Sequence, residues 1–132
     1  MADRVVGAAG AGLLVLLGVA RGDDPLQADR LAGKVARLRV FSDADGRFAH
    51  SLLDTGGDAL VVSQFTLLGD TRKGTRPSFT DAAASEHARP LYERFCETLG
   101  SEGVGRVERG EFGAFMQIEL VGDGPVTLLV ES

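Results

Sequence analysis

The sequence has few of the side chains that enzymes commonly use as nucleophiles or metal ligands. It contains one cysteine, Cys96, and two histidines, His50 and His87. A lone cysteine cannot form an internal disulfide, and no Cys/His spacing is typical of a zinc site. Neither histidine belongs to a pattern that suggests a triad, and Cys96 follows Phe95 on a predicted helix, where structural thiols are more common than reactive ones. We therefore expect no metal, no organic cofactor and no conventional nucleophilic side chain.

Positive charge is also in short supply. The 132 residues include 14 Lys and Arg against 19 Asp and Glu, a formal charge of −5. This balance argues against a protein that wraps nucleic acid broadly, because that mode depends on many cationic contacts to phosphates. A nucleic acid would have to be held locally, and the best candidates are Arg72, Lys73 and Arg76 in one loop. The alternative, equally weighted here, is a cluster of solvated charges.

Long apolar runs and targeting signals are missing. The longest apolar run, residues 13–19, is too short to cross a bilayer, and the N-terminus lacks the basic region and cleavage site of a signal peptide. We therefore expect a cytoplasmic protein with no membrane partner. The length predicts a single domain over residues 1–132 that can bury a core.

The pattern of apolar and turn residues predicts an α+β fold. Residues 13–19 read as a buried central strand, and Asp24-Pro25 starts a predicted helix over 25–38. A hairpin is expected around residues 43–46, followed by a buried strand over 59–67. A second helix is capped by Thr80 or Asp81 and stops at Gly100. Predicted strands over 104–107, 114–121 and 126–130 complete a largely antiparallel sheet.

Two short runs are the most informative part of the sequence. Ser63-Gln64-Phe65-Thr66 ends an apolar strand, and Gly124-Pro125 lies in the last predicted turn. Glycine lets another molecule approach the backbone, whereas proline fixes φ and is the only residue before which a cis bond is cheap, at roughly 0.5–1 kcal/mol. The second run therefore predicts a rigid stretch of main chain without bulky side chains.

The first run predicts backbone chemistry. At a strand end, the amides of Phe65 and Thr66 can point at a developing oxyanion, and each such donor typically lowers an acyl-transfer barrier by about 3 kcal/mol. Thr66 adds a hydroxyl at the same place. The alternative is that Ser63 and Thr66 only satisfy hydrogen bonds at the strand end. The presence of the Gly-Pro run in the same chain favours the catalytic interpretation.

Together with residues 13–19, 73–79 and 112–116, these runs resemble, in order, the signature of the D-aminoacyl-tRNA deacylases. The resemblance implies a curved, largely antiparallel sheet with two helices on one face, and a homodimer that hydrolyses the ester of D-aminoacyl-tRNA. It also implies that a cis Gly-Pro of one subunit enters the site of the other, where it holds the α-amino group and excludes L side chains. The 2′-hydroxyl of the RNA is thought to share the catalytic work. On this basis the expected site residues are, for catalysis, Thr66 and Gln64, and, for substrate binding, Ser63, Phe65, Met116, Gly124 and Pro125.

Two departures from the family pattern stand out. Family members normally begin with an additional strand that carries an Arg packed on the Gly-Pro element, and Met1 starts near the end of that strand. Arg4 is the nearest candidate, although its position does not match; either the start was assigned too far downstream or an edge strand was lost. Gly122 stands where an Asn is common, which makes the predicted Gly-Pro element less rigid and predicts weaker chiral selection.

Three readings of the function follow from the sequence. The leading one is hydrolysis of D-aminoacyl-tRNA, with glycyl-tRNA as a second substrate because glycine has no side chain to exclude. Another is a non-catalytic module that binds a nucleic-acid end or a peptide with the same backbone pocket. The third is an esterase for small molecules.

Overall fold

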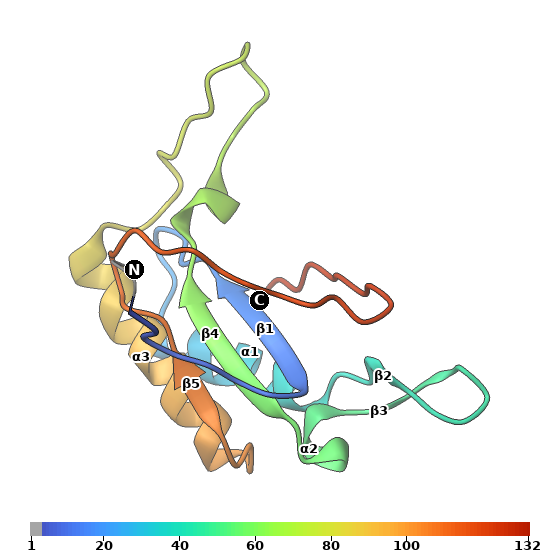
Figure 1. Ribbon diagram of the computed structural model, residues 1–132. Helices are drawn as coiled ribbons and strands as arrows, with labels where there is room; N and C mark the ends of the chain where they lie inside the picture. The colour runs from blue at the N-terminus through green and yellow to red at the C-terminus, as the bar shows by residue number, and fades with distance from the viewer. Residues whose placement is uncertain (1–3) are drawn as a thin grey trace.

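The computed structural model describes residues 4–132, and a three-stranded sheet lies at its centre (Figure 1). The sheet consists of β1 (Gly12–Leu17), β4 (Asp58–Ser63) and β5 (Val107–Arg109), in the order β1-β4-β5. Both pairings are parallel, with Leu17 opposite Ser63 and Val61 opposite Arg109. This register brings the carboxyl ends of β1 and β4 to the same edge of the sheet.

The expectation of a largely antiparallel sheet was wrong. Along the sequence, a helix connects the strands that are neighbours in this sheet. α1 (Pro25–Arg37) lies in the connection from β1 to β4, and α3 (Ser85–Ser101) lies in the connection from β4 to β5. Such a helical crossover returns the chain to the end of the sheet at which the previous strand began, so the next strand runs parallel to it. Within residues 4–132, antiparallel ladder pairing is confined to a separate hairpin of β2 (Phe41–Ser42) and β3 (Phe48–His50).

The number of helices was also underestimated. After β3 the chain forms a short helix, α2 (Leu52–Thr55), which was not among the predicted elements. Ser51 Oγ accepts a hydrogen bond from the Asp54 amide, and Asp54 Oδ2 accepts one from the Ser51 amide. This reciprocal capping stabilises a helix start. The Ser-x-x-Asp spacing was the signal that could have predicted it.

Both long helices pack on one face of the sheet. The core joins α1 and α3 to alternate residues of β1 and β4, as expected for a pleated strand with one covered face. The prediction for α1 is confirmed, since Asp24 caps it and Pro25 is its first residue. α3 begins at Ser85, later than expected. The buried side chains that the two helices contribute to this core are Ala32, Val35, Ala36, Tyr92, Phe95, Cys96 and Leu99.

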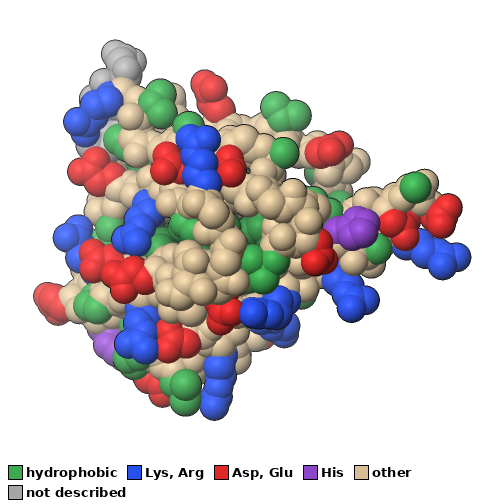
Figure 2. All heavy atoms as spheres, turned by 90° about the horizontal axis from the view of Figure 1, so that it is seen from below, with side chains coloured by type: hydrophobic (Ala, Val, Ile, Leu, Met, Phe, Trp, Pro, Cys, Tyr) green, Lys and Arg blue, Asp and Glu red, His purple; other side chains and the backbone are tan. Residues whose placement is uncertain are grey.

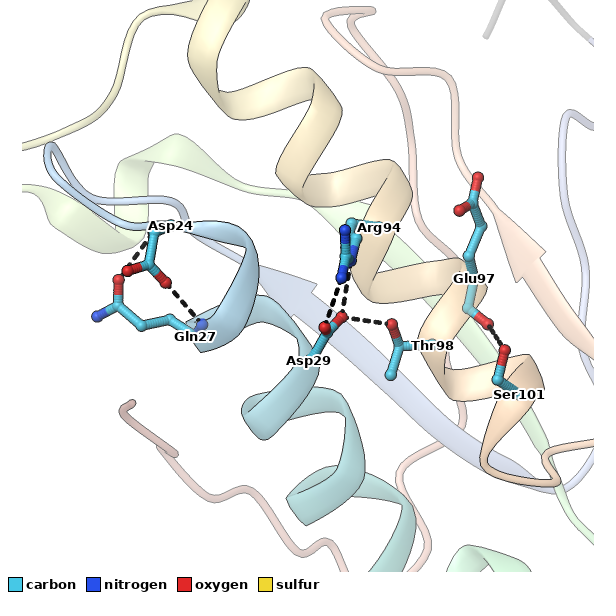
Figure 3. Close-up of polar contacts among 7 residues, drawn as sticks. All are labelled: Asp24, Gln27, Asp29, Arg94, Glu97, Thr98 and Ser101. Carbon is cyan, nitrogen blue, oxygen red and sulfur yellow. Dashed lines mark hydrogen bonds and ion pairs between the residues drawn. The ribbon is translucent and has the colours of Figure 1, made fainter.

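A polar contact ties the two helices together at the surface. Arg94 donates two hydrogen bonds to the Asp29 carboxylate, at 2.9 and 2.7 Å, and Thr98 Oγ1 donates a third at 2.8 Å (Figure 3). These donors, Arg94 above all, lower the pKa of Asp29 to about 2. Asp29 is therefore ionised throughout the physiological range, and this contact does not change with pH there.

The C-terminal segment forms an arm with little contact to the rest of the chain. Residues 117–129 are all exposed, and the arm runs from the end of β5 past β1 and doubles back (Figure 1). The strands expected over 114–121 and 126–130 do not form in the single chain, because their backbone has no neighbouring strand to pair with. The second face of the sheet is also incompletely covered, with Leu16 42% exposed.

No helix within residues 4–132 is both long enough and apolar enough to span a membrane.

Candidate active site

The Ser63–Thr66 run sits at the carboxyl end of β4, where the chain leaves the sheet. Ser63 is the last residue of β4, and Gln64 has φ −139° and ψ 82° before the chain turns into the 3-10 helix η1 (Phe65–Leu68). The Gln64 amide donates a 2.8 Å hydrogen bond to the Leu17 carbonyl at the end of β1. The start of η1 is thereby fixed to the edge of the sheet.

Two amides at the start of η1 are free to bind a ligand. The N–H groups of Phe65 and Thr66 form no hydrogen bond with any residue in the described part of the chain. The first amides of a helix lack acceptors within the helix, so they are satisfied by water or by a ligand. Phe65 is 57% exposed, and Thr66 is exposed as well. The strand expected over 59–67 ends at Ser63, and the turn that replaces it presents these donors to solvent.

The side chains of Gln64 and Thr66 are linked. Gln64 Nε2 donates a hydrogen bond to Thr66 Oγ1. Because this contact uses the hydroxyl oxygen as acceptor, the hydroxyl hydrogen remains available to a ligand. The Thr66 hydroxyl and the two free amides thus come from the same short turn.

Gly18 is a contributor that the sequence reasoning missed. A Cβ atom at this position would lie 2.6 Å from Leu68 Cδ2 and 3.3 Å from the Gln64 carbonyl oxygen. The absence of a side chain therefore allows η1 to pack directly on the end of β1. An apolar strand followed by glycine was visible in the sequence, but its packing partner was not.

Phe79 is a second residue that was not singled out for the site. Its ring packs edge-on against Phe65, with 5.2 Å between ring centroids and 70° between planes. Such edge-to-face pairs add about 0.5–1.5 kcal/mol beyond area burial. The contact joins η1 to the far end of the loop that follows it.

Met116 lies next to the same edge of the sheet. A Cβ atom on Gly110 would be 3.1 Å from Met116 Sδ and 3.4 Å from Val62 Cγ2. Met116 therefore packs on Gly110, close to the end of β4. Its sulfur also accepts a hydrogen bond from the Glu111 amide at 3.3 Å. The structure thus places Met116 at Gly110, just after β5, on the side where Gly110 approaches Val62 of β4.

Gly124 and Pro125 are not brought to this turn within one chain. Their peptide bond is cis, and Gly124 has φ +120°, a conformation that side chains other than glycine rarely adopt. Both residues are exposed on the arm, and no hydrogen bond within residues 4–132 joins them to the Ser63–Thr66 run. Within the single chain the two runs therefore form no common site.

Other reactive groups lie away from this turn. Cys96 is buried in the core, and burial raises the pKa of its thiol. Burial also raises the pKa of Tyr92 to about 12, and the Tyr92 hydroxyl donates a 2.7 Å hydrogen bond to the Val61 carbonyl. His87 Nε2 contacts the Asp23 carbonyl at 2.7 Å. None of these groups is held by a hydrogen bond to the Ser63–Thr66 run in the described structure.

Comparison with known proteins identifies the family. The D-Tyr-tRNA(Tyr) deacylase family matches residues 1–131. The chain belongs to this family. The D-aminoacyl-tRNA deacylase of Roseiflexus castenholzii is 59% identical over 129 residues, with 98% of this chain and 82% of the relative covered. The D-aminoacyl-tRNA deacylase of Anaeromyxobacter dehalogenans is 58% identical, with coverages of 97% and 85%.

Solved structures share the fold of this deacylase family member. The c-Myc DNA Unwinding Element Binding Protein superimposes with a TM-score of 0.86 at 37% identity, covering 94% of this chain and 84% of the other. A probable eukaryotic D-amino acid tRNA deacylase has a TM-score of 0.66 at 22% identity, which shows the fold alone.

Arg4 is the residue nearest in sequence to the family's orienting Arg. Its Nη2 atom lies 3.7 Å from Glu111 Oε2.

Proposed function

We propose that this chain hydrolyses the ester bond of D-aminoacyl-tRNA, releasing tRNA and the free amino acid. The observation that carries the proposal is the pair of unpaired amides, on Phe65 and Thr66, at the end of β4 in a chain of the deacylase family. Ester hydrolysis passes through a tetrahedral intermediate whose oxygen carries negative charge. Uncharged donors fixed in advance stabilise that oxygen without needing an acid or a metal.

The reaction uses water as the nucleophile. The water oxygen adds to the ester carbonyl carbon, and the carbonyl oxygen becomes the oxyanion that the amides of Phe65 and Thr66 bind. The bond between that carbon and the ribose oxygen then breaks, and the proton released by water goes to the ribose oxygen. The neighbouring ribose hydroxyl can relay this proton. Gln64 keeps the Thr66 hydroxyl oriented, while Ser63 and Met116 line the pocket for the terminal adenosine.

Chiral selection is assigned to Gly124 and Pro125 of a second copy of the chain. Their carbonyls hold the substrate's α-amino group, and their fixed main chain occupies the space that an L side chain would need. Side-chain pockets discriminate similar apolar groups by only about 1–3 kcal/mol, so a backbone barrier suits an enzyme that must accept many D side chains. Exposure of both residues in the single chain supports this assignment.

We also propose a homodimer, and uncovered apolar surfaces support it. The arm exposes large apolar side chains, including Phe115 at 92% and Val121 at 93%, and the second face of the sheet leaves Leu16 exposed. Large exposed apolar side chains are typical of interaction surfaces, and a closed two-fold dimer is the commonest arrangement for identical chains. We further propose that residues 1–132 act as one domain in the cytoplasm.

Deacylation assays test the proposed activity. The protein should release D-tyrosine from D-tyrosyl-tRNA and glycine from glycyl-tRNA, and it should leave L-tyrosyl-tRNA largely intact. Glycine enters because it has no side chain to collide with the Gly-Pro main chain. Hydrolysis of D-tyrosyl-tRNA without hydrolysis of glycyl-tRNA would show that steric exclusion is the wrong account of selectivity. Cleavage of free aminoacyl esters as fast as charged tRNA would favour the small-molecule esterase.

A binding module without catalysis is the second candidate. The solved neighbour with a TM-score of 0.86 is named as a DNA unwinding element binding protein, which favours a nucleic-acid ligand for this fold. Under this reading the chain binds charged tRNA but releases no amino acid. The same assays separate the two readings, because a binding module would leave D-tyrosyl-tRNA at its spontaneous rate of hydrolysis.

A further inference from the structure

The loop that follows η1 is a closed structure attached to the site. The Asp70 amide donates to the Ser78 carbonyl at 2.7 Å, and the Ser78 amide donates to the Asp70 carbonyl at 2.9 Å. Residues 71–77 between these two positions are all exposed, and the loop stands out from the body of the molecule beyond η1 (Figure 1). We name residues 70–78 the basic loop.

The three cations of the basic loop are not equivalent. Arg72 donates from Nε and Nη2 to the two oxygens of Asp70, at 2.9 and 2.7 Å, and these bonds lower the pKa of Asp70 to about 2. The positive charge of Arg72 is therefore paired with the Asp70 carboxylate inside the loop. Lys73 and Arg76 form no ion pair and no side-chain hydrogen bond with any residue between Arg4 and Ser132. They are the cations that the basic loop leaves available to a ligand.

The basic loop is held in position relative to the free amides. Phe79 immediately follows its closing residue and packs on the Phe65 ring. Gly69, just before the loop, leaves room for this contact, since a Cβ there would lie 3.0 Å from Phe79 Cε1. Both ends of the loop are thus fixed beside η1, from which the loop projects (Figure 1).

We propose that Lys73 and Arg76 bind phosphates of the tRNA acceptor end, just beyond the terminal nucleotide held at η1. This inference rests on the proposed function and assigns Arg72 a supporting role within the loop. Seven residues that fold back on themselves extend about 12 Å from the body of the protein at most. Along one nucleic-acid strand, this distance covers roughly three phosphates. Two cations on the loop can therefore contact phosphates within that distance.

The charge distribution favours this location for RNA. The whole chain carries a formal charge of −5, which repels a polyanion on average. The end of the molecule opposite the basic loop shows acidic and basic side chains interspersed, with no face of one sign (Figure 2). The basic loop, whose Lys73 and Arg76 have no carboxylate partner within residues 4–132, is therefore the favoured location for RNA.

Salt-dependent binding of uncharged tRNA tests the inference without relying on catalysis. Fluorescence anisotropy between 50 and 200 mM KCl should be compared for the wild type, Lys73→Ala, Arg76→Ala and the double variant. Each lost phosphate contact reduces the slope of log Kd against log salt by about one. Between 50 and 200 mM KCl, the rise in Kd should therefore be about tenfold smaller for the double variant than for the wild type. Arg47→Ala, which removes one exposed cation from the β2–β3 hairpin, is the matched control.

A second measurement separates this inference from the proposed activity. Hydrolysis of D-tyrosyl-adenosine ester, which has no phosphate beyond the terminal nucleoside, should be the same in the double variant and the wild type, whereas KM for D-tyrosyl-tRNA should rise with little change in kcat. A salt slope in the double variant equal to that of Arg47→Ala would overturn the assignment of Lys73 and Arg76. Loop-dependent binding without any deacylation would instead reject the hydrolase and retain the phosphate contacts.

Discussion

Replacing Phe65 with proline is expected to lower kcat/KM for D-tyrosyl-tRNA by about 10²–10³-fold relative to Phe65→Ala, because one oxyanion donor is lost. Both variants lose the aromatic ring and its contact with Phe79, so their difference isolates the backbone N–H group. The comparison therefore measures the contribution of the Phe65 amide directly. Single-turnover deacylation with saturating enzyme would assign the loss to the chemical step.

The fold should tolerate this proline. Phe65 is the first residue of η1, and proline is favoured at the first position of helices because its missing N–H would have no acceptor there. The preceding residue, Gln64, has φ −139° and ψ 82°, outside the α region that a following proline disfavours. Thermal unfolding should thus give similar midpoints for Phe65→Pro and Phe65→Ala. Equal activities of two folded variants would show that this amide takes no part in catalysis.

Gly124→Ala is expected to lower kcat/KM for D-tyrosyl-tRNA by about 100-fold, the loss typical of a displacement of about 1 Å at a reacting centre. Gly124 has φ +120°, and an added Cβ would lie 3.1 Å from Val126 Cγ2 and 3.2 Å from the Val126 amide nitrogen. Alanine therefore shifts the main chain that is proposed to hold the α-amino group. Steady-state assays of D-tyrosyl-tRNA and glycyl-tRNA measure the effect.

Gly46→Ala provides the matched control for this substitution. Gly46 also has positive φ, at +79°, but nothing lies within 4 Å of an added Cβ, and the residue is in the turn between β2 and β3. It should have the local strain of alanine in a left-handed conformation without loss of activity. Similar losses in both variants would mean that Gly124 matters only for folding.

Local signals in the sequence predicted local structure well. Asp24 followed by Pro25 gave the start of α1, and the apolar run before Gly18 gave β1, because capping and strand burial depend on neighbouring residues. Strand direction was not predictable in this way. Whether β1 and β4 run parallel depends on how α1 crosses the sheet, and the turn-like residues near Gly46 favoured antiparallel pairing over the whole chain.

The candidate site was predictable only in part. The Ser63–Thr66 run stands out in the sequence, and within the described chain the amides of Phe65 and Thr66 have no acceptor, whereas the Gln64 amide donates to the Leu17 carbonyl. The close approach of η1 to Gly18 and the contact between Phe65 and Phe79 join distant residues, so no local pattern reveals them. The C-terminal arm lacks strand partners within its own chain, and apolar alternation could not show that.

In the proposed dimer, each site combines the Ser63–Thr66 run of one chain with the Gly124-Pro125 run of its partner. The most direct test is a heterodimer purified with two affinity tags, one chain carrying Phe65→Pro and the other Gly124→Ala. One of its two sites then combines both defects, and the other combines two intact runs, so it should recover about half of the wild-type activity per dimer. If each site used a single chain, every site would carry one defect, and a heterodimer no more active than the two homodimers would contradict the account.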